Sequence, residues 1–299
     1  MEVLRTPDEY FEDLDGFDFE AHYAQGTGGI RIHYLDEGPR SGPVALLMHG
    51  EPSWCYLYRK MIPTLVSHGI RCVAPDLVGF GKSDKPTNPA DYTYQNHVEW
   101  MASLVFGTLT LEDVTLYCQD WGGLIGLRLV GEKPNIFSRV VVSNTGLPTG
   151  DRPPTEAFLS WQRYSQESPE LPVGAIVERG CKTPLTQSVV RAYDAPFPDD
   201  SYKVGARVFP TLVPTSTEDP ARKANLAAWE VLERFERPFV CAFSDSDPIT
   251  RGGERAFLGR IPGTKGQPHR TIEGAGHFLQ EDQGPAIAEL LVELMAQRG

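Results

Sequence analysis

Short apolar runs alternate with longer segments of mixed polarity along most of the chain. Residues 30–36 alternate apolar and polar side chains, as in a half-buried strand, whereas residues 44–48 are continuously apolar. Continuous apolar strands separated by helix-length segments indicate a mostly parallel sheet covered by helices on both faces. Apolar residues at helical spacing over 287–295 predict a final helix packed on this sheet. The other predicted strands are 71–74, 114–119, 139–143, 239–243 and 269–272.

The segment 150–222 lacks this pattern. It is rich in proline and contains no run typical of a central strand, which favours short helices. We therefore predict an α/β core formed by residues 1–149 and 223–299, with residues 150–222 inserted as a helical cap. An insert at this point would lie over the carboxyl ends of the strands, where open α/β sheets bind ligands. The first 24 residues show no recognisable chemistry and are expected to pack outside the core.

Composition narrows the class of protein. A chain of 299 residues with 40% hydrophobic residues suits one large domain, or one domain plus an insert. The formal net charge of −12 argues against a nucleic-acid partner. Five scattered cysteines without a CxxC motif disfavour a disulfide framework or a zinc site and predict reduced thiols. The N-terminus lacks the apolar core of a signal peptide, and no run is long enough to span a membrane, so we expect a cytoplasmic protein without a membrane partner.

The sharpest local signal joins the run 114–119 to a helical pattern. Residues 118–123, Cys-Gln-Asp-Trp-Gly-Gly, have the form of a nucleophile elbow, in which small residues allow a strained turn. The usual serine is replaced by Asp120. A carboxylate is anionic at neutral pH, and its attack on a saturated carbon gives an ester that water can cleave. The alternative is that Asp120 only caps the following helix.

A base and an acid follow late in the chain. His277 lies in a glycine-containing loop after the run 269–272, where a water-activating base is expected. Asp247, after the run 239–243, is the preferred acid to orient it, and Asp245 is the reserve. The chain order is therefore nucleophile, acid, base. Because the base must be neutral, activity is expected to fall below the pKa of this imidazole, which is about 6–7 before the protein perturbs it.

A His-Gly turn follows the early run 44–48. The backbone N–H groups of Glu51 and Trp121 are predicted to form an oxyanion hole. His49 is then structural. The side chain of Glu51 is either a buried hydrogen-bonded carboxyl group or a turn residue.

These residues together resemble the haloalkane dehalogenases of the α/β-hydrolase superfamily, from about residue 25 to the C-terminus. The segment Gln119-Asp120-Trp121 and Glu51 are the more specific features, and they look like the subfamily whose acid follows the penultimate strand. The motifs that carry the wider resemblance are Asp120–Gly123, His49–Pro52, Asp76–Asp84 and Gly276–Phe278.

The resemblance implies an α/β-hydrolase fold, a helical cap, and hydrolysis of a small neutral haloalkane to an alcohol, a halide ion and a proton. It implies a monomer that needs no cofactor and no metal. The indole N–H groups of Trp121 and Trp161 would hold the halide, and Phe158 and Phe209 would line the substrate pocket. A second interpretation makes Trp161 only a core aromatic of the cap. The tryptophans interpreted as packing residues are Trp54, Trp100 and Trp229.

Three other functions compete with this one. An epoxide hydrolase uses the same Asp/Asp/His set and needs acidic hydroxyl groups, for which the predicted cap offers Tyr164, Tyr193 and Tyr202. Release of fluoride from a fluoroacid is disfavoured because an arginine is expected at the position of Trp121. A catalytically silent binding module is disfavoured because the triad is complete.

Overall fold

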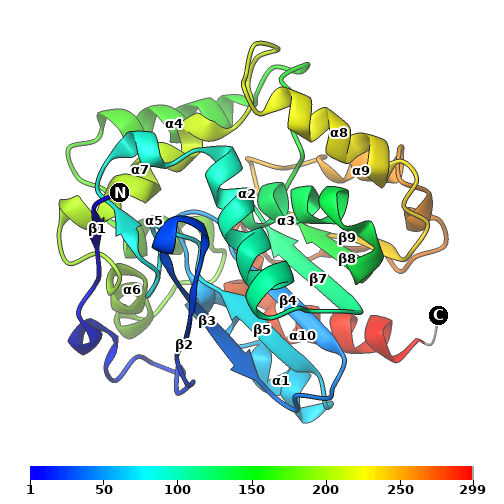
Figure 1. Cartoon of the computed structure of the whole chain (residues 1–299), viewed down its shortest axis with the longest axis horizontal. Coiled ribbons are helices and arrows are strands. Elements are labelled where there is room, and N and C mark those ends of the chain that lie inside the picture. The colour runs from blue at the N-terminus through cyan, green and yellow to red at the C-terminus, as the bar shows by residue number, and fades with distance from the viewer. Residues whose placement is uncertain (298–299) are drawn as a thin grey trace.

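The computed structural model describes residues 1–297 and contains a central sheet of eight strands in the order β10-β9-β8-β7-β4-β5-β3-β2 (Figure 1). Neighbours from β10 to β5 are parallel, whereas β3 runs antiparallel to β5 and β2 runs antiparallel to β3. The mostly parallel sheet predicted from the apolar runs is therefore confirmed. Its strands are β2 (His22–Gln25), β3 (Arg31–Glu37), β4 (Val44–Met48), β5 (Arg71–Pro75), β7 (Val114–Gln119), β8 (Phe137–Ser143), β9 (Phe239–Ser244) and β10 (Arg270–Ile272).

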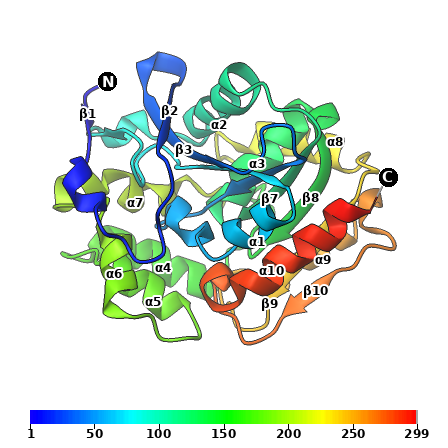
Figure 2. The same ribbon diagram turned by 90° about the horizontal axis from the view of Figure 1, so that it is seen from below.

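Helices cover both faces of this sheet (Figure 2). Every residue of β4 and β7 is buried, which explains why β4 is continuously apolar and β7 is apolar except for Thr115 and Gln119. One face carries α1 (Ile62–Ser67) and α10 (Leu279–Ala296), so the predicted final helix begins earlier than its apolar periodicity suggested. The other face carries α2 (Tyr94–Ala102), α3 (Trp121–Glu132) and α8 (Arg222–Leu232), while α9 (Glu254–Leu258) lies near β9.

Four short helices lie between β8 and α8. They are α4 (Glu156–Glu167), α5 (Val173–Gly180), α6 (Gln187–Asp194) and α7 (Val204–Val208), and they gather at one end of the molecule in Figure 1. The short helices expected for the proline-rich segment are thus present. In contrast, α8 packs along α3 on the core. The division of the chain at residues 150 and 222 stays a prediction, which these helix positions support.

The N-terminal residues wrap around the core, and they do more than the sequence indicated. Val3–Leu4 (β1) pairs with Lys85–Pro86 (β6), and β2 extends the edge of the main sheet. The rings of Phe11 and Phe17 contact Trp54, with centroids 5.5 and 4.9 Å apart. Within residues 1–297, no helix combines the length and the apolar character that crossing a bilayer requires.

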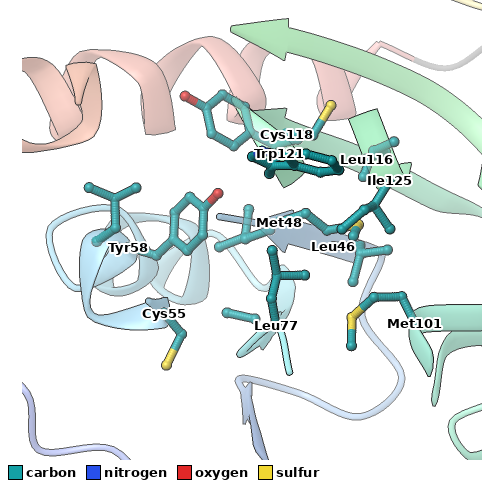
Figure 3. Packing of buried hydrophobic residues seen from close by; sticks show 14 of the residues in the cluster. Leu46, Met48, Cys55, Tyr58, Leu77, Met101, Leu116, Cys118, Trp121 and Ile125 are labelled. Carbon is teal, nitrogen blue, oxygen red and sulfur yellow. The ribbon is translucent and has the colours of Figure 1, made fainter. Parts of the chain in front are cut away.

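The core beneath the carboxyl ends of the strands is densely packed (Figure 3). Side chains of β4 (Leu46 and Met48) and β7 (Leu116 and Cys118) belong to one buried cluster with Ile125 of α3, and all are shielded from solvent. The turn after β7 therefore stands on a rigid base, since close-packed interiors resist displacement.

Candidate active site

The turn after β7 presents Asp120 in a conformation that few residues adopt. Its φ and ψ are 51° and −126°, and its carboxylate makes no capping hydrogen bond to α3, so the helix-cap alternative is wrong. A side chain at Gly122 would place Cβ only 2.0 Å from the carbonyl oxygen of Met48, so this position requires glycine. The Thr145 hydroxyl donates to the Asp120 carbonyl oxygen at 2.7 Å and ties the turn to the end of β8. The geometry is that of a nucleophile elbow.

The structure brings His277 and Asp247 to this carboxylate. His277 Nε2 lies 3.6 Å from Asp120 Oδ2, and His277 Nδ1 lies 3.0 Å from Asp247 Oδ2. Asp247 is itself held by the N–H of Ile249 at 2.9 Å and by the hydroxyl of Thr250. An imidazole between two carboxylates is the arrangement of a catalytic triad.

The charges of the three residues are coupled. Burial disfavours the imidazolium form of His277, but the carboxylates of Asp247 and Asp120 outweigh burial and raise its pKa well above the ordinary value. Burial likewise opposes ionisation of Asp247, yet His277 and the hydrogen bonds from Thr250 and Ile249 lower its pKa to about 2. The ordinary imidazole pKa of about 6–7, from which the sequence argument started, is thus raised in the free protein, because both neighbouring carboxylates favour the protonated ring.

Asp245, the reserve acid, binds the backbone of the loop before His277 and not the imidazole. Its carboxylate accepts the N–H groups of Gly274 at 3.0 Å and Ala275 at 3.3 Å. These bonds lower the pKa of Asp245 and shape the loop that leads to His277. The preferred acid, Asp247, is the one in contact with the imidazole.

The turn after β4 supplies a hydrogen-bond donor to Asp120. The N–H of Glu51 donates to Asp120 Oδ1 at 2.8 Å, as the oxyanion-hole prediction requires, and the N–H of Trp121 belongs to the first turn of α3 beside it. His49 is buried; its Nε2 accepts the N–H of Leu77, so its Nδ1–H donates to Gly50. Burial lowers the pKa of His49, and the ring acts as a neutral brace rather than as a base.

The Glu51 side chain is a buried carboxyl group. Burial raises the pKa of this carboxyl group well above the ordinary value, and the charge of Asp120 raises it further. A hydrogen bond from the Trp161 side chain acts in the opposite direction and is outweighed. Its Oε1 has no hydrogen-bond partner among the described residues. A neutral acid therefore lies beside the nucleophile, since a second anion there would be repelled.

Two tryptophans line the cavity above Asp120, one from each side. Trp121 comes from the elbow and Trp161 from α4, and both belong to a cavity of about 1170 Å³ that also contains the triad. Neither of these two indole N–H groups is held by a backbone carbonyl oxygen within residues 1–297, and the Trp161 side chain lies beside Glu51. By contrast, the indoles of Trp54 and Trp229 donate to carbonyl oxygens at 3.1 and 2.8 Å. The first pair can serve an anion in the cavity, whereas Trp54 and Trp229 are committed to packing.

The two predicted pocket phenylalanines differ. Phe158 lies on the cavity wall, in the first turn of α4. Phe209 is fully buried, with its ring centroid 4.8 Å from that of Trp121 and 4.3 Å from that of His97, and it is not one of the cavity-lining residues. Its predicted place in the pocket lining is therefore corrected: Phe209 supports Trp121 from behind, because the helical segment that carries it turns the ring into the core.

Two residues that hold His277 and its loop, Gln119 and Asn144, were not predicted from the sequence. The Gln119 amide lies 3.1 Å from His277 Nε2 and donates to its carbonyl oxygen at 3.2 Å. The Asn144 amide donates to the carbonyl oxygens of Gly276 and His277, both at 3.0 Å. Their place in the sequence could have identified them, because both residues lie at the carboxyl end of a parallel strand beside the elbow.

A second group of possible metal ligands lies away from the cavity. His33, Cys55 and Asp76 come together although their spacing in the sequence shows no metal motif. Asp76 is already occupied by His33 Nδ1 at 2.7 Å, by the N–H of Cys55 and by the N–H of Lys82, and burial raises the pKa of the Cys55 thiol. A saturated carboxylate and a neutral thiol do not suit a metal ion, and the cluster braces the loop after β5.

Known proteins resemble this chain along nearly its whole length. A family model described as the alpha/beta hydrolase fold matches residues 43–283, and the chain is an α/β hydrolase by this criterion. A haloalkane dehalogenase of Psychrobacter cryohalolentis is 56% identical over 299 residues, which cover 99% of this chain and 98% of that protein. A haloalkane dehalogenase of Mycolicibacterium paratuberculosis is 51% identical over 98% of each chain.

A solved structure extends the similarity. The haloalkane dehalogenase DpaA of Paraglaciecola agarilytica NO2, described as tetrameric, superposes with a TM-score of 0.89 at 36% identity over 97% of each chain. The chain belongs to the haloalkane dehalogenase family.

Proposed function

We propose that this protein hydrolyses haloalkanes through a covalent alkyl ester on Asp120, with Asp247 and His277 completing the triad. The observation that carries the proposal is the uncapped carboxylate in the elbow. Glu51 holds its Oδ1 at 2.8 Å, while Oδ2 faces the cavity and the imidazole. One oxygen is therefore fixed and the other is available to attack.

In the first step, an electron pair of Asp120 Oδ2 forms a bond to the halogen-bearing carbon, and the carbon–halogen pair leaves with the halide. The indole N–H groups of Trp121 and Trp161 stabilise the halide ion in a cavity whose wall includes Phe158. Charge-assisted hydrogen bonds of this kind gain strength where water is excluded.

In the second step, water hydrolyses the ester. Alkylation removes the negative charge of Asp120, which is one of the two causes of the raised pKa of His277. A larger fraction of His277 is therefore neutral, and able to act as a base, once the ester has formed. His277 takes a proton from water, whose oxygen attacks the ester carbon, and the charge on Oδ1 rests on the Glu51 N–H. The bond between the carboxyl carbon and Oδ2 then breaks, and Oδ2 leaves in the alcohol with the second proton of that water. The water oxygen remains in Asp120, and His277 releases its proton to solvent.

The competing epoxide hydrolase needs two hydroxyl groups aimed at the nucleophile. Of the three candidate tyrosines, Tyr164 lines the cavity. Tyr193 is buried and donates its hydroxyl hydrogen to Glu281, and Tyr202 is not a lining residue. The hydroxyl pair is therefore not assembled, which favours the dehalogenase.

The decisive experiment measures bromide and acid released from 1-bromobutane and 1,2-dibromoethane, with styrene oxide as the competing substrate. Equal amounts of bromide and acid are expected. One turnover in ¹⁸O-labelled water should place the label in Asp120, and His277→Phe should retain the alkyl group as a mass gain on the intact protein. Turnover of the epoxide alone, or of neither substrate class, would refute the proposal.

We further propose a monomer located in the cytoplasm. Few large hydrophobic side chains of the described residues are exposed, namely Met1, Tyr10, Tyr23, Leu226 and Leu258, and all five cysteines are free thiols, as suits a reducing compartment. Light scattering after size exclusion tests the monomer: a tetramer, like the relative described as tetrameric, would contradict it.

A further inference from the structure

The loop that carries His277 is bonded to the cap as well as to the sheet. The His277 N–H donates to the carbonyl oxygen of Gly180, the last residue of α5, at 2.7 Å. The N–H of Phe278 reaches the same oxygen at 3.4 Å. A side chain at Gly276 would place Cβ 2.2 Å from this oxygen, so the contact requires glycine there. The backbone of the base and the end of α5 thus touch directly.

Asp282, in the first turn of α10, ties these two segments together. Its carboxylate accepts the N–H of Thr183 at 2.7 Å and that of Lys182 at 2.9 and 3.0 Å, both in the connection after α5. The same carboxylate accepts the N–H of Gly276, the residue before His277, at 2.9 Å. One side chain therefore satisfies three backbone donors from the cap connection and from the base loop.

The neighbouring acid anchors the cap independently. Glu281 is buried, forms an ion pair with Arg59, and accepts the hydroxyl hydrogen of Tyr193 from α6. Removing the Asp282 carboxylate therefore leaves this second attachment between cap and core in place. A substitution at Asp282 should loosen the base loop without detaching the cap.

We propose that Asp282 is a positioning residue for His277, and that it couples the cap connection Gly180–Thr183 to ester hydrolysis. This inference rests on the proposed function. Alkylation uses only the Asp120 carboxylate and the halide donors, whereas hydrolysis needs the imidazole to hold a water at the ester carbon. Small displacements of a base are costly, so loss of Asp282 slows the second step selectively.

The test compares Asp282→Asn and Asp282→Ala with Glu289→Gln, which removes the same charge from an exposed position on α10. Rapid quenching with 1-bromobutane and intact-protein mass spectrometry measures alkylation and hydrolysis separately. We expect hydrolysis to slow by about tenfold or more in the Asp282 variants, with wild-type alkylation and accumulation of the ester. The pH profile of hydrolysis should also shift, since the imidazole no longer keeps its place beside Asp247.

The hydrolysis rates of these variants test the positioning role of Asp282. Hydrolysis as fast as in Glu289→Gln, or an equal loss in both steps, would overturn the positioning role. If Asp282→Ala does not fold, Asp282→Asn, which keeps size and one acceptor oxygen, decides instead. A wild-type protein that releases no bromide, together with no ester in His277→Phe, would reject the proposed function itself, which is a distinguishable outcome.

Discussion

The two sides of the cavity are built differently. On the core side, Asp120, Asp247 and His277 stand at strand ends and are each held by several hydrogen bonds. On the cap side, Phe158 and Trp161 come from α4, whose first turn is capped by Thr155, and they offer apolar surface and a neutral donor. Charged groups that exchange protons act only in a defined hydrogen-bond geometry. An apolar wall acts mainly through the shape of the surface that it presents to the substrate. Substitutions on the core side should therefore cost more than those on the cap side.

The largest loss is expected for Asp120→Ala. Without the carboxylate no ester forms, and halide release should fall on the order of 10⁴-fold or more. Bromide release and the intact mass check this prediction. Unfolding by urea serves as the control and should show a folded protein. Residual turnover near the wild-type rate would remove Asp120 from its role.

Asp247→Asn comes next. The amide cannot stabilise the imidazolium and favours the wrong tautomer, so hydrolysis should fall by about 10²- to 10⁴-fold. Alkylation should persist, and the ester should accumulate in mass spectra. Asp245→Asn is the matched control, because Asp245 contacts the loop backbone and not the imidazole. Equal effects of the two substitutions would contradict the assignment of the acid.

Trp161→Phe tests the cap side. Removing one N–H donor from an ion should weaken halide binding by about 10- to 150-fold, since hydrogen bonds to charged groups contribute about 1.5–3 kcal/mol. Quenching of tryptophan fluorescence by bromide measures the affinity. Trp54→Phe is the control, because its indole is committed to the carbonyl oxygen of Ala192. An unchanged affinity in Trp161→Phe would indicate another donor.

A smaller effect is expected for Phe209→Leu, which weakens the support behind Trp121. The smaller side chain should lower the free energy of unfolding by about 1–2 kcal/mol, less than the cost of complete truncation. Halide affinity should fall less than in Trp161→Phe. Urea unfolding and fluorescence quenching measure the two effects. A change in substrate size preference without loss of stability would instead place Phe209 at the pocket surface.

The last prediction concerns proton affinity. In Asp120→Ala the pKa of His277 should fall, because one of its two carboxylate neighbours is gone. In the wild type, protonation of His277 stabilises the fold below about pH 6.5, its ordinary pKa. That stability is lost as pH rises through the raised folded pKa. Imidazole NMR titration of both proteins checks the shift, and an identical midpoint would show that Asp120 does not act on His277.

Much of this protein is determined by local sequence. The hydrophobic pattern predicted seven of the eight strands of the main sheet, β3 from its alternation and parallel strands such as β4 from short apolar runs, which burial on both faces favours. The elbow, the late histidine and the two aspartates after β9 were visible because strand ends and small residues mark such turns. Since parallel strands end at one edge, their proximity could be predicted without coordinates. The edge strand β2 was missed because its four residues, His22–Gln25, carry too weak an alternation.

Tertiary structure alone decided which side chains meet. It turned Asp247 rather than Asp245 toward His277, placed Phe209 behind Trp121, and made Glu51 a neutral buried acid. It also brought Gly180 and Asp282 to the loop of the base. These outcomes depend on side-chain direction and on contacts between segments far apart in the chain. A sequence pattern records which residues are buried, but packing and charge fix what each one touches.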